Sequence, residues 1–192
     1  MKKKLLNILK YVLFGVLGLI ALKSVWSFVD ARTGYHVPFC GLRECAIVSD
    51  SMSFVNNNNV DRLANHKNQF KKGDMVMTST YYTYDSLKEG DIVTYRSSNG
   101  VLVCHRIVSK ETQDNIKGFI IQGDANPNTD GFIAYSRING KVYGIIPSLG
   151  NITNFFQSWY GVGAICISMV FICAGILIID SSNSKKEKAK NE

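Results

Sequence analysis

Two long apolar stretches lie near the ends of the chain, and a more polar segment separates them. The C-terminal stretch, Trp159–Ile179, contains no charged residue. At about 1.5 Å per residue, a helix of this length crosses the roughly 30 Å hydrocarbon core of a membrane. We therefore predict a transmembrane helix over 158–180, followed by a basic cytoplasmic tail over 181–192 that carries four lysines.

The N-terminal stretch, residues 1–30, is also apolar, but Lys10 and Lys23 interrupt it. The uncharged part between them, 11–22, is short enough to be the apolar region of a cleaved signal peptide. We favour a retained membrane anchor, because no small-x-small cleavage site follows cleanly and both lysine side chains can reach a membrane interface. Either alternative places the segment after residue 30 outside the cytoplasm.

The segment 31–157 has the pattern of short β-strands separated by turns. Its strand candidates are rich in β-branched and aromatic residues and are bounded by Gly, Asp and Asn. They cover 45–52, 73–82, 90–96, 101–108, 118–124 and 141–147. Because no internal repeat or βαβ spacing is present, we predict a mainly β fold. This is a compact antiparallel β domain, flanked by N- and C-terminal transmembrane helices.

A run of four asparagines marks the segment 54–72, which interrupts the strand pattern. Such a low-complexity run predicts a solvated loop. Apolar residues follow it at a spacing that allows one short amphipathic turn. These are Val60, Leu63, Ala64 and Phe70.

The net charge of +7 comes mainly from the two ends of the chain. Residues 1–29 carry five lysines and no acid, and the tail carries four more lysines. Basic residues beside a transmembrane helix mark its cytoplasmic side, so both ends are predicted to be cytoplasmic and the β domain extracytoplasmic. The central segment is nearly neutral, and this argues against a nucleic-acid-binding face.

The five cysteines are compatible with an oxidising compartment. Cys166 and Cys173 lie in the C-terminal apolar stretch and are read as small apolar residues. Cys40 and Cys45 flank a short segment of the β domain, and a disulfide between them is one alternative; free thiols are the other. No CxxC pair or histidine cluster is present, so we predict no metal site and no cofactor.

Three polar residue types in the β domain could together form a nucleophilic site. Ser51 follows a β-rich run, and His105 lies on the strand 101–108. Two acids, Asp124 and Asp130, follow in the sequence GDANPNTD. A serine nucleophile needs a base, and the base needs a group that fixes its tautomer. Taken singly, each residue also fits a structural role in a turn or in the core.

Two other interpretations of these residues are open. In the first, Cys104 is the nucleophile; adjacent strand residues point to opposite faces, however, so Cys104 cannot readily use His105 as its base. In the second, the β domain binds a protein partner outside the cell and has no catalytic role, with Ser51 and His105 purely structural. Loss of the base or of the acid from the sequence would favour this second interpretation. Both residues are present.

The order of these motifs resembles type I signal peptidases. SDSM (49–52), GDIVTY (90–95), HRIV (105–108) and GDANPNTD (123–130) resemble the successive conserved boxes of this family, and KVYGIIP (141–147) follows them. His105 stands where the commoner bacterial branch has lysine. The resemblance is therefore to the Ser-His branch, which includes the endoplasmic reticulum enzyme and relatives in Gram-positive bacteria and archaea.

The resemblance implies a role for each candidate residue. Ser51 would be the nucleophile, His105 the general base and Asp130 the residue that orients the base. Asp124 would be a supporting carboxylate, and Ser49 would assist the oxyanion hole formed by the Ser51 backbone N–H. The sequence departs from the family at Phe54, where proline is common, and in the Asn-rich segment beside the site.

The implied activity is removal of signal peptides that end in small residues from secretory preproteins, at the membrane lipid. The high lysine and asparagine content and the short tail favour a bacterial plasma membrane over the endoplasmic reticulum membrane. We therefore expect a multi-pass plasma-membrane protein with an extracytoplasmic catalytic domain.

Overall fold

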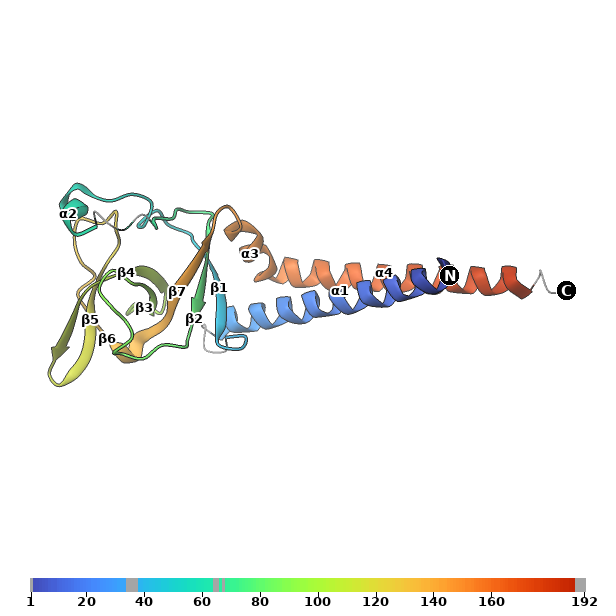
Figure 1. The fold of residues 1–192 in the computed structure, drawn as a ribbon, viewed down its shortest axis with the longest axis horizontal. Coiled ribbons are helices and arrows are strands. Elements are labelled where there is room, and N and C mark those ends of the chain that lie inside the picture. Colours follow the sequence, from blue (N-terminus) through green and yellow to red (C-terminus); the bar gives the residue numbers. More distant parts are fainter. Residues whose placement is uncertain (1, 34–37, 64–65, 67, 189–192) are drawn as a thin grey trace. The chain divides into compact units, whose positions relative to one another are not determined.

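The computed structural model describes residues 2–33, 38–63, 66 and 68–188. The chain forms two compact units. The first consists of residues 1–28 and 156–192, and the second of residues 29–155. The first unit is helical, and the second contains the β-sheet (Figure 1).

Two apolar helices supply most of the first unit. They are α1 (Lys2–Arg32) and α4 (Trp159–Lys188). Their stretches Ile8–Arg32 and Trp159–Ile179 are long and apolar enough to span a membrane. The ring of Phe28 packs edge-on against Trp159, with 4.5 Å between the ring centroids. The protein thus has an apolar helix near each terminus, as predicted.

The second unit is built on one antiparallel sheet of seven strands. Their order across the sheet is β1-β2-β7-β3-β4-β5-β6, and every neighbouring pair is antiparallel. Bulges interrupt three of these pairings, and bulges bend and twist a strand, which curls the sheet (Figure 1). The strands are β1 (Leu42–Ala46), β2 (Met75–Ser79), β3 (Ile92–Arg96), β4 (Leu102–Gln113), β5 (Ile116–Gln122), β6 (Phe132–Ala134) and β7 (Ile138–Ile146).

Apolar side chains cover both faces of the central strands. Val93 of β3 belongs to a core cluster with Ile107 and Phe119, whereas its neighbour Ile92 belongs to a second cluster with Val76. Successive side chains of a strand point to opposite faces, so β3 is buried on both sides. This double burial fixes the register of β3 with β4, the strand that carries His105.

The predicted strands are largely present, with three corrections. The strand expected over 45–52 lies earlier, at 42–46, because residues 47–52 form a turn that returns to the sheet through backbone bonds between Ile47 and the 73–74 turn. The short strand β6 was not predicted, since only three of its residues pair with β5. The hairpin β3–β4 is confirmed, and β4 continues beyond the predicted end to Gln113.

The Asn-rich segment is more ordered than a solvated loop. It contains the 3₁₀ helix η1 (Asn57–Asn59), started by an Asn56 cap, and the single turn α2 (Val60–Leu63). Asn59 is only 4% exposed, and its amide donates to the carbonyls of Asp124 and Asn126, each at 3.1 Å. Leu63 and Phe70 are buried, Val60 is exposed, and Ala64 lies outside the described residues.

The remaining elements are short. The 3₁₀ helix η2 (Tyr135–Arg137) connects β6 to β7, and the helix α3 (Gly150–Phe156) follows β7. Asp74 joins two turns of the sheet domain, since its carboxylate accepts the N–H groups of Lys71 and Ser148, both at 2.9 Å. These bonds lower the pKa of Asp74.

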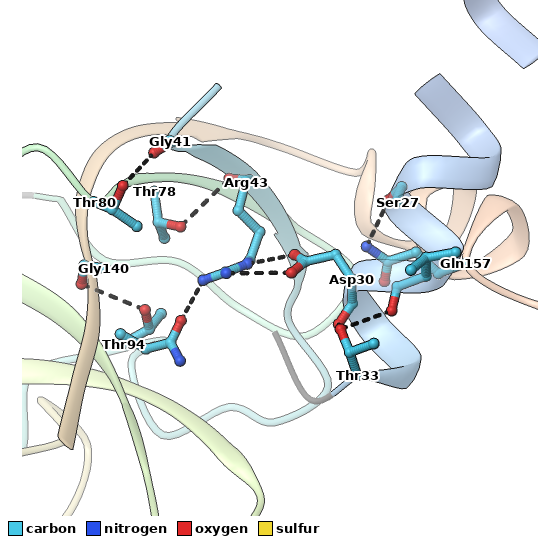
Figure 2. Close-up of polar contacts among 12 residues, drawn as sticks. Ser27, Asp30, Thr33, Gly41, Arg43, Thr78, Thr80, Thr94, Gly140 and Gln157 are labelled. Atoms are coloured by element: carbon cyan, nitrogen blue, oxygen red, sulfur yellow. Dashed lines mark hydrogen bonds and ion pairs between the residues drawn. The ribbon is translucent and has the colours of Figure 1, made fainter. Parts of the chain in front are cut away.

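An ion pair joins the end of α1 to the sheet. Arg43 of β1 donates from Nε to the Asp30 carboxylate at 2.6 Å, and both side chains are almost fully buried. Figure 2 shows the Arg43 side chain extending from β1 toward Asp30. Arg43 also donates to the side-chain oxygen of Asn139. A buried ion pair of this kind tolerates loss of neither partner.

The cysteines Cys40 and Cys45 do not form a disulfide; both are free. Cys40 is exposed, whereas Cys45 lies in the second core cluster. Burial raises the pKa of Cys45 to about 12 and holds the pKa of Cys104 well above its usual value. A raised pKa keeps the thiol protonated at neutral pH, and only the thiolate is the strong nucleophile.

Alkylation of the native protein at neutral pH should therefore separate these cysteines. Iodoacetamide is expected to modify Cys40 readily and to leave Cys45 and Cys104 unmodified until denaturant is added. Peptide mass spectrometry measures the modified fraction at each position, and the denatured protein serves as the control for full reactivity. Modification of Cys45 at the rate of Cys40 in the native state would contradict the burial described here.

Candidate active site

Ser51 lies in the turn after β1, and several bonds fix this turn. Asp50 accepts the N–H of Ser53 with its carbonyl and the N–H of Lys72 with its carboxylate. The carbonyl of Ser51 accepts the N–H of Ala125 at 2.9 Å. Met52 is almost completely buried, which anchors the chain directly after the serine. The turn leaves the Ser51 side chain partly exposed.

His105 of β4 forms a hydrogen bond with Ser51. The distance from His105 Nε2 to Ser51 Oγ is 2.8 Å. Its other ring nitrogen, Nδ1, lies 2.5 Å from Asp130 Oδ2. The His105 side chain is 8% exposed and that of Asp130 is 19% exposed. A proton on Nδ1, held by the carboxylate, leaves Nε2 free to accept the proton of the serine hydroxyl.

The face on which His105 lies follows from strand geometry. His105 pairs with Val93, and Val103 and Ile107, two residues away on either side, belong to or pack against the core cluster of Val93, as the alternation predicts. Cys104 pairs with Thr94 and packs against the other cluster. The structure therefore places Cys104 and His105 on opposite faces. Together with the raised pKa of the Cys104 thiol, this argues against a cysteine nucleophile.

Asp130 is positioned by its backbone and by a tyrosine. Its N–H donates to the carbonyl of Ile121 at 2.7 Å, which ties it to β5. Burial, and after it the negative charge of the nearby Asp130 carboxylate, raise the pKa of Tyr95, which is almost fully buried. The rings of Tyr95 and His105 also lie near each other, with 6.5 Å between their centroids. Tyr95 thus lies close to two members of the Ser51–His105–Asp130 chain.

Asp124 has a different environment and does not bond His105 among the described contacts. Its carboxylate pairs with Arg106, from Nε to Oδ1 at 2.8 Å and from Nη2 to Oδ2 at 2.6 Å. Both side chains are completely buried. Gln69 donates to the same carboxylate at 3.0 Å, and the backbone carbonyl of Asp124 accepts the N–H of Asn56. Asp124 therefore holds together the loops around the site.

Ser49 lies beside the serine pair. Its hydroxyl oxygen is 3.3 Å from Ser51 Oγ. Among the described backbone hydrogen bonds, none uses the N–H of Ser51 as donor. One hydroxyl and one backbone N–H are thus available next to Ser51 Oγ, the arrangement that stabilises a negatively charged oxygen during acyl transfer.

Gly123 lets the chain pass close to the site. A methyl group at this position would lie 2.9 Å from His105 Nε2 and 2.8 Å from the carbonyl oxygen of Ser51. Contacts this short require the neighbouring atoms to move. Because the carbonyl oxygen belongs to the backbone, its movement would also shift Ser51. Gly123 is therefore required by the spacing between Ser51 and His105.

We expect Gly123→Ala to lower the rate of the reaction carried out at this site by about 100-fold, because a displacement of about 1 Å has that effect on catalysis. The thermal midpoint should also fall, because a methyl group 2.8 Å from a backbone carbonyl oxygen forces the backbone to shift. Gly144→Ala is the matched control, because a methyl group there has only ordinary contacts. Full activity of Gly123→Ala would contradict the geometry.

Three residues of the site have no assigned role in the sequence analysis. They are Tyr95, Gly123 and Arg106. Tyr95 is the last residue of GDIVTY, Arg106 is the second residue of HRIV, and Gly123 opens GDANPNTD. A signal was therefore present for each: an arginine next to the candidate base, a tyrosine on the same strand face two residues after Val93, and a glycine directly before an acid.

Comparison of the chain with known proteins does not assign a function to this site. A scan against protein-family models finds no family that matches the chain, and a search of curated proteins finds no match.

Proposed function

We propose that the protein is a membrane-anchored serine endopeptidase of the signal-peptidase type, which removes N-terminal signal peptides from secretory preproteins. The observation that carries the proposal is the continuous chain of hydrogen bonds from Ser51 through His105 to Asp130. The order of the sequence motifs supports the substrate class, and the two apolar helices support a site at a membrane.

The proposed reaction begins when Ser51 Oγ attacks the carbonyl carbon of the scissile peptide bond. His105 Nε2 takes the hydroxyl proton as the bond forms, and Asp130 stabilises the resulting imidazolium. The oxygen of the tetrahedral intermediate would be held by the Ser51 N–H with help from the Ser49 hydroxyl. Loss of one such donor lowers the rate by about 10² to 10³-fold in related chemistry.

The second half of the reaction releases the products. His105 returns its proton to the amine of the mature protein, which leaves as the new N-terminus. The signal peptide is then bound to Ser51 as an ester. A water molecule, activated by His105, hydrolyses this ester and restores the free serine.

The proposal includes an orientation in the membrane. Lysines lie at the start of α1, before its apolar stretch, and follow the apolar part of α4, so both ends are expected in the cytoplasm and the sheet domain outside. In a Cys40→Ser background, an impermeant thiol reagent should label a cysteine introduced at Asn57 in intact cells and should not label one at Ser184. Lysed cells give the control for full labelling. Labelling of Ser184→Cys in sealed cells would reverse the orientation.

The proposed activity is tested in the host cell. Replacement of the gene by a Ser51→Ala version is expected to make secretory precursors accumulate with their signal peptides intact, as measured by N-terminal peptide mass spectrometry. The matched control is Ser53→Ala, which alters an exposed turn hydroxyl that bonds only the Asp50 carbonyl among the described contacts. Normal processing in the Ser51→Ala strain, without another peptidase of this class, would contradict the proposal.

A further inference from the structure

A cavity of about 380 Å³ lies on the sheet domain away from Ser51. This volume is within the range of about 300 to 1,000 Å³ that small ligands occupy in proteins. Among the residues that the structure describes, three arginines line it and no acidic residue does. The other described lining residues are mostly polar. The described lining is Pro38, Arg43, Thr80, Tyr82, Arg96, Ser136, Arg137, Ile138 and Asn139.

Arg96, a residue of the cavity wall, has side-chain hydrogen-bond donors that lack a partner among the described residues. Its Nε and Nη2 atoms are buried, and neither bonds any of the described residues. A buried guanidinium nitrogen without an acceptor is unfavourable, because it has lost its water and gained nothing in exchange. Buried polar groups in native structures nearly always have a partner, so these donors call for a ligand, an ion or a water molecule. Nε and one terminal nitrogen form the fork that binds two oxygens of a phosphate or carboxylate.

The other two arginines add positive charge to the same cavity. Arg137 lines the same cavity and donates to the backbone carbonyl of Arg96, a bond that leaves the charge of Arg137 without a carboxylate. Arg43 is paired with Asp30. Three guanidinium groups and one carboxylate therefore meet here, and the excess of positive charge favours an anion.

The cavity also lies beside the end of the helix that we propose as a membrane anchor. Asp30, the partner of Arg43, is two residues from the end of α1 and of its apolar stretch Ile8–Arg32. Pro38, on the cavity wall, follows the same helix end along the chain. In a protein anchored by α1, the last residues of this helix lie at the level of the lipid headgroups.

We propose that this cavity binds the phosphate group of an anionic membrane phospholipid, with Arg96 as the principal ligand and Arg137 as the second. The proposal rests on the membrane anchoring proposed above, but not on peptidase activity. A phosphate diester has two free oxygens, which match the fork of Arg96. Occupation of the cavity would hold the sheet domain to the membrane at the end of α1.

The test uses the full-length Ser51→Ala protein in an uncharged detergent, with binding measured by native mass spectrometry. The added ligands are dioleoyl phosphatidylglycerol, dioleoyl phosphatidylcholine and inorganic phosphate. We expect one molecule of phosphatidylglycerol to bind preferentially. Arg96→Met and Arg137→Met should each weaken this binding by about tenfold or more, the effect of losing one hydrogen bond to a charged group. The control Lys88→Met removes an exposed charge elsewhere and should change binding less than about twofold.

Thermal stability separates ligand binding from a structural role. Without anionic lipid, Arg96→Met should unfold at the same or a higher temperature than the parent, because it removes unpaired buried donors. Phosphatidylglycerol should raise the midpoint of the parent and of Lys88→Met, but not that of Arg96→Met. A lowered midpoint for Arg96→Met in the absence of lipid would assign the side chain to the fold and overturn the proposal.

The remaining outcomes are equally decisive. Equal binding of phosphatidylglycerol to parent and Arg96→Met would overturn the site, and binding of inorganic phosphate as tightly as the lipid would overturn the lipid as its source. Failure of membrane anchoring is recognised separately, by release of the chain from cell membranes at alkaline pH. Failure of peptidase activity leaves these binding measurements unchanged, since all proteins in the test carry Ser51→Ala.

Discussion

Ser51→Ala and His105→Ala should each lower the rate of precursor cleavage by about 10⁶-fold, the scale seen when a serine protease loses its nucleophile or base. Ser51 Oγ and His105 Nε2 are 2.8 Å apart and act as one unit in the proposed mechanism. The double variant should therefore be hardly slower than either single variant. Cleavage of a purified precursor, followed by gel densitometry or mass spectrometry, measures these rates.

The matched control for these variants is Cys104→Ser. Cys104 adjoins His105 but packs on the opposite face, so its replacement should leave most of the activity. Thermal unfolding of every variant confirms that the fold is retained. Additive losses in the double variant, or an inactive but well-folded Cys104→Ser, would contradict a Ser51–His105 mechanism.

The second large effect is expected from the acids, which should behave differently. Asp130→Asn should lower kcat by up to about 10⁴-fold while the thermal midpoint is retained. The amide would no longer fix the proton on His105 Nδ1 or stabilise the imidazolium. Its side chain is partly exposed, and its backbone N–H keeps the bond to the Ile121 carbonyl, so the fold should tolerate the change.

Asp124→Asn should instead destabilise the protein, by about 3 kcal/mol or more, because it leaves the charge of Arg106 uncompensated in a fully buried position. The activity of this variant should fall in proportion to its folded fraction, and the loss should be smaller at lower temperature. Thermal unfolding and kcat are measured on the same samples. A stable but inactive Asp124→Asn, together with a normally active Asp130→Asn, would exchange the roles of the two acids.

The sequence predicted an element correctly where its pattern of apolar and polar residues extended over many residues or alternated strictly. The C-terminal apolar helix and the β3–β4 hairpin are of this kind, since 21 uncharged residues or two strands around SSNG admit few alternatives. The three-residue strand β6 carries too little pattern to be recognised. The turn at 47–52 is apolar enough to resemble a strand, and only its bonds to the turn at 73–74 explain why it leaves the sheet.

The sequence predicted which residues form the candidate site, but it did not predict which acid bonds which partner. Alternation along 101–108 placed His105 on the face opposite Cys104, and the structure has this arrangement. Asp124 and Asp130 are six residues apart in one turn-rich segment, and no periodicity decides between them. The structure distinguishes the two acids by their partners. Asp124 is fully buried and binds Arg106 on one face of β4, whereas Asp130 is partly exposed and bonds His105 on the other face. The role of Asn59 was missed because its bonds join segments more than sixty residues apart.

The most direct test of the central claim is the N-terminal sequence of the product formed when the purified full-length protein is incubated with a secretory precursor in detergent. The account predicts a single cleavage, directly after the small residues that end the signal peptide, with none by the Ser51→Ala protein. Absence of cleavage by the folded parent protein, or the same cleavage by Ser51→Ala, would contradict it.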